Sequence, residues 1–468
     1  MKPMTRLGLA TFACVFAGVF AGVAGPVSAD RGMIRNVRMI NVEEPAQRAI
    51  IAFNGTREVL ILQTDVRAAE ETRVVEFMPL PSKPEVSLAP ETCFAELAKI
   101  VREHRLAYGG RSGRTGQGVK DEGAGAAVVV VVTAQLGPHA VTVVEVKDAD
   151  AFTAWVKDFF RKNDLGEPAL EDQLRVVVSD YLNRNIRFFA FDVVTMSPEK
   201  KTVQPLAYRF DCDRLYYPLK VTNLYGGTGV VELFVVIPES LDRNRLGGSD
   251  FIRISQAPIL RAGAPNVPAE VLTKEEAKKA AVARVSDRGV LRSNIVALKP
   301  EELRGLHPDI PAVMWNGGAH MIAVRYAGPL HFDADVEGVL GFGSSTDAAR
   351  AFFRTLRTGN AEMLGPLVGV PFAFDGREVV TDKAELMKKF ERAIAKPLGE
   401  PDAQPEVVEM PVGSYRFVLR EDFDRRFVEQ HLLKGNAAIV GLTLAGEEAR
   451  IFVRRDADRL WRVVGFRD

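Results

Sequence analysis

The sequence predicts an α+β protein in two parts, a β-rich N-terminal module with packed helices and a C-terminal module of helices and antiparallel strands. Three observations support this. Short β-rich runs alternate with amphipathic helical segments along the chain. The composition, 47% apolar and 26% charged over 468 residues, is that of a globular protein with room for several cores. A glycine- and serine-rich stretch at residues 338–346 separates two regularly patterned regions.

The first 29 residues predict export. Lys2 and Arg6 precede an uncharged, largely apolar run over residues 7–24, and Val27-Ser28-Ala29 forms a cleavage site with small residues at both key positions. The alternative is an uncleaved anchor helix, because the apolar run approaches membrane-spanning length. The glycines in the run and the well-formed site favour cleavage. We therefore expect a mature chain from Asp30 without a membrane span, in the periplasm or outside the cell.

The charge balance argues against a polyanionic partner. Lys and Arg together number 61, as do Asp and Glu, and removal of Lys2 and Arg6 with the signal segment leaves 59 basic against 61 acidic residues. Such a chain has no general attraction for nucleic acid, so we expect no nucleic-acid partner. The sequence contains no complete cofactor-binding motif, so we expect no cofactor.

The N-terminal module is expected to begin with a hairpin over residues 47–62. Two β-rich runs flank Asn54-Gly55, a dipeptide typical of a type I′ turn. Asp148 is expected to cap a helix. The other expected elements are a strand at 73–78, a helix from Pro90 to about Arg105, strands at 126–134 and 140–146, a helix at 169–183, and strands near 187–196, 203–210, 214–222, 229–237 and 320–326.

The C-terminal module is expected to start with a helix capped by Ser345, Thr346 or Asp347. A strand pair that turns at Asp375-Gly376 follows, and then a helix at 383–394. The strands expected after it lie at 405–410, 414–420, 436–444, 448–454 and 459–466. We therefore divide the chain into residues 1–29, 30–342 and 343–468, and a split of the middle part into 30–240 and 241–342 stays open.

Several phrases between residues 45 and 240 carry a family resemblance. They are Gln-Arg-Ala-Ile-Ile-Ala at 47–52 leading to Gly55, Met-Pro-Leu-Pro-Ser-Lys-Pro-Glu-Val at 78–86, Phe-Phe-Ala-Phe at 188–191, Pro-Leu-Ala-Tyr-Arg-Phe at 205–210 and Tyr-Pro-Leu-Lys-Val at 217–221. This block resembles an exported bacterial family known only as domain of unknown function 2330. The resemblance implies export and supplies no chemistry.

The last 125 residues or so show the order helix, strand pair, helix and antiparallel strands, ending in Leu-Trp-Arg-Val-Val-Gly at 460–465. This order resembles the nuclear-transport-factor-2-like (NTF2-like, cystatin-like) fold. The resemblance implies a cone of helices on a curved antiparallel sheet that can enclose a pocket. Relatives with this fold include isomerases, dehydratases and proteins that only bind or pair with themselves, so a homodimer through this module is one expectation.

The most chemical-looking phrase is His331-Phe-Asp333-Ala-Asp335-Val-Glu337-Gly338. In a strand, alternate residues share a face, and as a calcium loop Asp333, Asp335 and Glu337 would occupy ligand positions. The loop ends in Ser344 where a bidentate Glu is needed. The alternatives are therefore a metal site and a solvated strand face that leads into the linker.

A second candidate lies in the C-terminal module, where Asp375, Tyr415, His431 and Trp461 could line a pocket. A buried carboxylate with a raised pKa and a phenol donor would suit proton transfer beside a carbonyl. The structural alternative is an ordinary turn at Asp375-Gly376 and a Trp461 that packs under the first helix.

Two cysteines, Cys93 and Cys212, remain after signal cleavage. In an oxidising compartment they permit one disulfide, and two separate buried thiols are an equal alternative. No complete catalytic motif occurs. The prediction is therefore a non-enzymatic exported binding or interaction protein. The alternative is a small-molecule isomerase or hydrolase that uses a pocket in the C-terminal module.

Overall fold

The structure is a computed structural model that describes residues 32–34, 42–43, 46–63, 65–68, 72–109, 128–168, 172–196, 201–202, 204–224, 228–248, 251–255, 290–394 and 404–467. The expected signal segment, residues 1–29, and the glycine-rich segment 110–127 lie outside the described residues. The described part is a mixed α+β molecule with several open sheets and about ten helices. None of these helices is long and apolar enough to cross a membrane.

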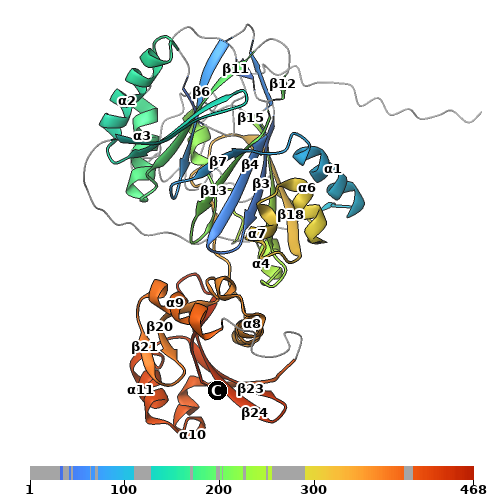
Figure 1. The fold of residues 1–468 in the computed structure, drawn as a ribbon, viewed down its shortest axis with the longest axis vertical. Helices are drawn as coiled ribbons and strands as arrows, with labels where there is room; N and C mark the ends of the chain where they lie inside the picture. The colour runs from blue at the N-terminus through green and yellow to red at the C-terminus, as the bar shows by residue number, and fades with distance from the viewer. Residues whose placement is uncertain are drawn as a thin grey trace, which may run out of the picture.

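The described residues form two lobes (Figure 1). The N-terminal lobe runs from Gly32 to Gly338, and the C-terminal lobe runs from Phe342 to Arg467. The expected hairpin is confirmed as β3 (Ala46–Phe53) and β4 (Arg57–Gln63), which pair antiparallel. Residues 54–56 form its three-residue turn. The Asn54 side chain stabilises this turn by accepting hydrogen bonds from the backbone N–H groups of Thr56 and Arg57. Only Gly55 has a positive φ, so the expected type I′ geometry is wrong.

The larger sheet of the N-terminal lobe contains this hairpin. Its strand order is β7 (Glu85–Leu88), β13 (Leu206–Asp211), β4, β3, β15 (Thr228–Pro238), β18 (Ala319–Pro329), β16 (Val290–Ser293) and β8 (Tyr108–Gly109), with β17 (Val296–Leu298) also on β18. Helices α1 (Cys93–Glu103), α6 (Pro300–Leu306) and α7 (Ile310–Val313) cover its outer face. Their apolar side chains pack on Ile50, Val59 and Ile61.

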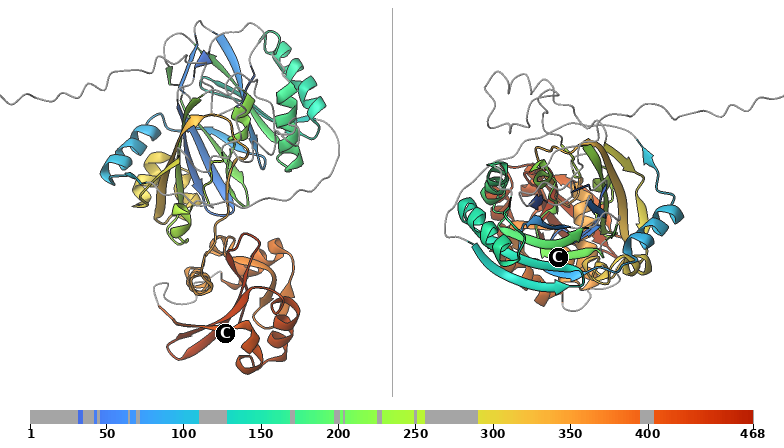
Figure 2. Two further views of the ribbon diagram at one scale, coloured as in Figure 1. Left: turned by 180° about the vertical axis from the view of Figure 1, so that it is seen from behind. Right: turned by 90° about the horizontal axis from the view of Figure 1, so that it is seen from above.

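The second sheet of this lobe has the order β1 (Gly32–Ile34), β6 (Thr72–Leu80), β11 (Phe188–Met196), β10 (His139–Val146) and β9 (Val128–Leu136). Helices α2 (Ala149–Lys162) and α3 (Asp172–Asn183) pack on it through an aromatic cluster in which the Phe77 and Phe152 rings lie 6.1 Å apart. Asp148 caps α2 as expected, accepting from the Ala151 N–H at 2.8 Å. The two helix groups therefore enclose the two sheets from opposite sides (Figures 1 and 2).

Short elements connect the sheets. They are β2 (Val42–Glu43), β5 (Asp65–Ala68) and β12 (Lys201–Thr202), which form a small sheet, α4 (Asn244–Gly247), and β14 (Leu215–Tyr217), which pairs with β19 (Val336–Gly338). The strand expected at 214–222 is thus shorter than predicted. Pro218 ends it, and a 3-10 helix, η1 (Lys220–Leu224), follows.

The C-terminal lobe is a six-stranded sheet with helices on both faces. The strand order is β21 (Glu378–Val380), β20 (Val368–Phe374), β25 (Trp461–Arg467), β24 (Glu447–Arg455), β23 (Ala437–Leu444) and β22 (Glu406–Pro411). Helices α8 (Ser345–Thr358) and α9 (Lys383–Ala393) pack on one face. Helices α10 (Tyr415–Val418) and α11 (Asp422–His431) pack on the other, so the structure does not confirm the NTF2-like cone.

Alternating burial shows that both faces of this sheet are covered. Val440, Val453 and Val463 belong to the core on the α8 side, and their neighbours Ile439, Phe452 and Val464 belong to the core on the α11 side. The strand expected at 414–420 is wrong, since this segment forms α10. Tyr415 and Leu419, four residues apart, both point into the core, as a helical turn requires.

Candidate functional site

The acidic phrase before the lobe boundary forms an ion-pair network. Asp335 is fully buried, and its carboxylate accepts hydrogen bonds from Tyr181 Oη at 3.0 Å, Arg184 Nη1 at 2.8 Å and the Lys220 backbone N–H at 2.7 Å. Burial raises the pKa of Asp335, although the Arg184 guanidinium opposes this effect. Glu337 pairs with the same guanidinium. We call Asp335, Glu337, Arg184 and Tyr181 the Asp335 network.

This geometry argues against the metal-site hypothesis. A guanidinium occupies the position between Asp335 and Glu337 that a cation would need, and Asp333 lies exposed outside the network. Within the described residues, no group of three or more His, Cys, Asp or Glu side chains could hold a metal ion. The alternation expected for a strand fails here because β19 begins only at Val336.

The two cysteines are free thiols, so the structure contains no bridge between them. Cys93, the first residue of α1, packs on the outer face of the larger sheet, whereas Cys212 contacts the core on the inner face. The two cysteines also lie near opposite ends of β13, which has six residues. The segment before Cys93 reaches one end, where the Ala89 N–H donates to the Pro205 carbonyl, and Cys212 follows Asp211 at the other end. Burial raises the pKa of Cys93 to about 11 and raises that of Cys212 as well, which keeps both thiols protonated.

The four candidate residues of the C-terminal lobe are spread over its sheet. Asp375 lies in the β20–β21 turn with φ of 49° and pairs with Arg377 at 3.2 Å. Tyr415 donates a hydrogen bond to Glu429, and the His431 ring lies 5.0 Å from the Phe427 ring. Trp461 packs on the opposite face, beside the core that α8 covers. The structure therefore gives each of them a separate local contact instead of one shared pocket.

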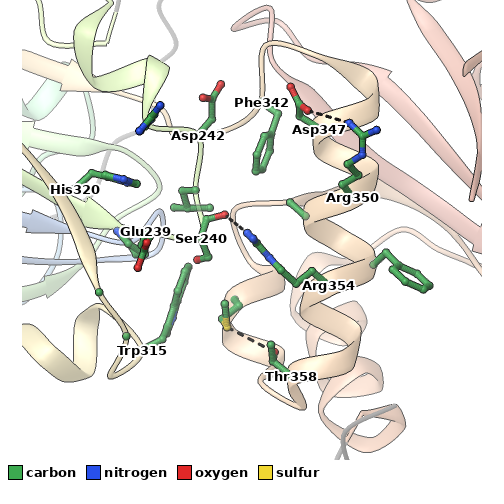
Figure 3. A pocket seen from close by; sticks show the side chains of 18 of the residues that line it. Glu239, Ser240, Asp242, Trp315, His320, Phe342, Asp347, Arg350, Arg354 and Thr358 are labelled. Carbon is green, nitrogen blue, oxygen red and sulfur yellow. Dashed lines mark hydrogen bonds and ion pairs between the residues drawn. The ribbon is translucent and has the colours of Figure 1, made fainter. Parts of the chain in front are cut away.

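The described residues instead form a cleft of about 930 Å³ between the two lobes (Figure 3). One wall belongs to the N-terminal lobe and consists of residues 238–244, after β15, together with Met314, Trp315, Gly317, Gly318 and His320. The other wall is mainly α8, with Phe342 before it and Asn360 and Met363 after it. Segments more than 100 residues apart in the chain thus meet at this cleft.

The N-terminal wall carries two buried polar atoms without a partner in the described structure. They are the indole Nε1 of Trp315 and Nδ1 of His320. Burial lowers the pKa of His320 despite the nearby Glu239 carboxylate, so this imidazole is neutral at pH 7. Figure 3 shows both side chains directed toward the segment that carries Ser240. Unpaired buried polar groups are uncommon and costly in folded proteins.

The backbone at Trp315 is strained. Trp315 and Asn316 both adopt the left-handed conformation, with φ of 54° and 60°. This conformation is rare for a bulky residue, and such strain concentrates at functional sites. Hydrogen bonds hold the turn, since the Asn316 N–H donates to the Pro311 carbonyl at 2.6 Å.

The C-terminal wall is the polar face of α8. Ser344, one residue before the expected candidates Ser345, Thr346 and Asp347, caps this helix by accepting from the Asp347 N–H, so the predicted cap is wrong. The apolar residues Ala348, Phe352 and Leu356 face their own sheet. The opposite face presents Asp347, Arg350, Arg354 and Thr358 to the cleft. Arg354 Nη2 donates to the Ser240 carbonyl at 3.0 Å and so links the two walls.

Sequence reasoning missed this cleft, and only a weak signal for it exists. Trp315-Asn316-Gly317-Gly318 combines an aromatic residue with a turn sequence, which is unusual for a plain surface loop. Nothing in the local pattern of α8 distinguishes a cleft wall from a solvent-exposed face.

Comparison with known proteins assigns a family to most of the N-terminal lobe. The profile of an uncharacterised protein conserved in bacteria, domain of unknown function 2330, matches residues 32–331. No curated protein matches the chain. Two solved structures of baculovirus p35, one of them a mutated form after caspase cleavage, align at 7% and 8% identity with TM-scores of 0.28 and 0.26.

Both alignments cover 64% of this chain, and they cover 97% and 100% of the p35 chains. A likeness at these TM-scores supports no conclusion about fold or function. The family match extends over more than half of the chain and agrees with the resemblance carried by the phrases between residues 45 and 240. The chain therefore belongs to the uncharacterised bacterial family of domain-of-unknown-function-2330 proteins.

Proposed function

We propose that this chain is an exported, non-enzymatic binding protein whose ligand site is the cleft between the lobes. The observation that carries the proposal is the pair of unpartnered buried atoms, Trp315 Nε1 and His320 Nδ1, in the wall of a cleft of about 930 Å³. A ligand that supplies hydrogen-bond partners there would remove the cost of leaving these groups unpaired. The cleft volume is also in the range of ordinary small-molecule sites.

The residues first considered for catalysis favour binding over an isomerase or hydrolase. An acid and a phenol that act on one carbonyl must lie within hydrogen-bond reach of the same point. Asp375 instead pairs with Arg377 in an edge turn, while Tyr415 bonds to Glu429 on α11. The cleft itself offers donors, acceptors and rings suited to recognition.

A thermal-shift screen of the purified mature protein against metabolite and peptide mixtures tests this proposal. We expect hits whose shift is lost in Trp315→Phe, which keeps a ring and removes the indole N–H. The control is Arg304→Ala, on the exposed side of α6 and outside the cleft lining. Hits that raise the melting temperatures of Trp315→Phe and wild type equally would contradict a binding site in the cleft. Turnover of a hit into product would contradict a non-enzymatic role.

We also propose export through residues 1–29 and a domain boundary at 338–346. Pairing of β19 with β14 ties residue 338 to the N-terminal lobe, and the bridge between Phe342 and Trp461 ties residue 342 to the C-terminal one. We further propose that the C-terminal lobe has an NTF2-like origin. Its residues 345–467 show the order helix, strand pair, helix and strands that this origin requires.

Expression of residues 343–468 alone tests the boundary. Because helices cover both faces of its sheet, we expect a soluble fragment with cooperative unfolding by circular dichroism. A fragment that is insoluble unless residues 30–342 are co-expressed would show that the two lobes share one core. Mass spectrometry of the protein from its native host checks the predicted cleavage before Asp30.

A further inference from the structure

We propose that the cleft binds a short peptide with free termini, its carboxylate toward α8 and its ammonium toward residues 239–242. This inference rests on the cleft being the ligand site. It goes further by assigning the chemical class and the direction of the ligand.

The C-terminal wall carries excess positive charge. Arg350 and Arg354 lie one helical turn apart on the cleft face of α8. Arg350 forms an ion pair at 3.7 Å with Asp347 of its own helix, and both side chains are about half exposed, at 48% and 55%, so the wall keeps one positive charge in excess. Arg354 donates to a neutral carbonyl and forms no ion pair within the described residues. Two guanidinium groups at this spacing suit a carboxylate ligand.

The N-terminal wall carries the opposite excess. Glu239 and Asp242 line it with Arg243, and neither carboxylate has an ion pair among the described residues. The Asp242 carboxylate accepts the Asn244 backbone N–H at 3.0 Å, as an ordinary turn cap. This wall therefore has a net charge of about −1, and the α8 wall has about +1.

These opposite charges do not neutralise each other across the cleft. The Arg354–Ser240 hydrogen bond crosses it, and no ion pair does so in the described part of the chain. A ligand with one charge would match one wall and leave the other unmatched. A ligand with a cationic end and an anionic end matches both walls at once.

The remaining lining suits the middle of a peptide. Trp315, Phe342 and Phe353 offer apolar rings for a side chain. The Trp315 indole N–H can donate to a peptide carbonyl, and the neutral His320 imidazole offers its unpartnered Nδ1 to a peptide group. Both unsatisfied atoms and both charged walls thus find partners in one kind of molecule.

Calorimetry with tripeptides tests the assignment. The probes are Ala-Leu-Ala, Ala-Phe-Ala and Ala-Trp-Ala, each as the free peptide, the N-acetyl form, the C-amide and the doubly blocked form. We expect the free forms to bind and each single block to weaken binding about tenfold or more, because each removes one charge-assisted contact.

Two charge variants locate the ends. In Arg350→Ala/Arg354→Ala, the free peptide and its C-amide should bind equally, because the partner of the carboxylate is gone. In Glu239→Gln/Asp242→Asn, the free and N-acetyl forms should bind equally. Arg304→Ala, outside the cleft, should keep the wild-type ranking. A role limited to folding would lower all four affinities together without changing their ratios.

Doubly blocked peptides that bind as well as free ones would overturn the inference, as would variants that leave the ranking unchanged. If no tripeptide binds but a screened ligand of another class loses affinity in Trp315→Phe, the cleft remains the ligand site and the peptide assignment is wrong. If every ligand found binds the Trp315→Phe variant as tightly as it binds the wild type, the cleft is not the ligand site and the peptide assignment is also wrong.

Discussion

Two polar clusters, the Asp335 network within the N-terminal lobe and the cleft between the lobes, differ in one decisive respect. In the Asp335 network, the fully buried carboxylate receives three hydrogen bonds and a guanidinium lies between the two acids. In the cleft, two buried polar atoms have no partner and the charged groups of opposite walls stay apart. The first cluster is complete as it stands. The second leaves interactions for another molecule to make.

This contrast shows that acids at alternate positions in the sequence can form an ion pair inside the fold. The phrase around Asp335 attracted attention because three acids recur at alternate positions. Inside the fold, Asp335 of this phrase pairs with Arg184. The cleft residues share no motif, and their significance comes from what they lack in the folded chain.

The largest expected effect comes from removing Arg184 from the Asp335 network. Arg184→Met should lower the free energy of unfolding by about 3–5 kcal/mol, because it leaves the Asp335 carboxylate buried without its counter-ion. Urea unfolding monitored by circular dichroism measures this change. Arg184→Met/Asp335→Asn should recover a large part of the loss. If Arg184→Met is as stable as wild type, the Asp335 network does not stabilise the fold.

A second change tests a buried acid that has no guanidinium. Glu58 is fully buried on β4 and accepts the Tyr216 N–H at 2.8 Å, and burial raises its pKa well above 4.5. In the pH range above 4.5 and below this raised pKa, folded Glu58 holds a proton that the unfolded chain has lost. Wild-type stability therefore falls as pH rises through that range.

Glu58→Gln removes this titration and keeps the side-chain shape. Relative to wild type, its free energy of unfolding should rise by about 1.4 kcal/mol for each pH unit within the range. Urea unfolding of both proteins at pH 5, 6, 7 and 8 checks the slope. Glu301→Gln, at an exposed site on α6, should show none. A difference that does not change with pH would mean that Glu58 stays ionised in the fold.

The smallest expected effect on stability comes from removing the two arginines of the cleft wall. Arg350→Ala/Arg354→Ala should change the stability of the ligand-free protein by less than about 1 kcal/mol, because these side chains are exposed and make few contacts. Thermal unfolding without ligand is the measurement. A loss as large as that of Arg184→Met would show that the cleft wall is structural, and the contrast between the two clusters would disappear.

Local sequence patterns determined much of the secondary structure. The cap of α8 lies at Ser344, one residue before the expected candidates. Two β-rich runs around Asn54-Gly55 specified the hairpin β3–β4, and the cap at Asp148 specified where α2 begins. These features depend on neighbours within a few residues, so the sequence is sufficient to predict them. The phrases at 47–52, 78–86 and 205–210 also identified the family that the profile then matched.

Tertiary structure decided the rest, because the deciding partners are remote in the chain. Arg184 reaches Asp335 from 151 residues away, which turned an apparent metal loop into an ion pair. The local pattern of residues 414–420 predicts a strand, yet residues 415–418 are helical, with Tyr415 and Leu419 packed into one core. The cleft brings residues 238–244 and 314–320 against α8, and no local period encodes that meeting. Which polar groups end without partners depends on where distant elements come to rest, and only the folded chain contains that information.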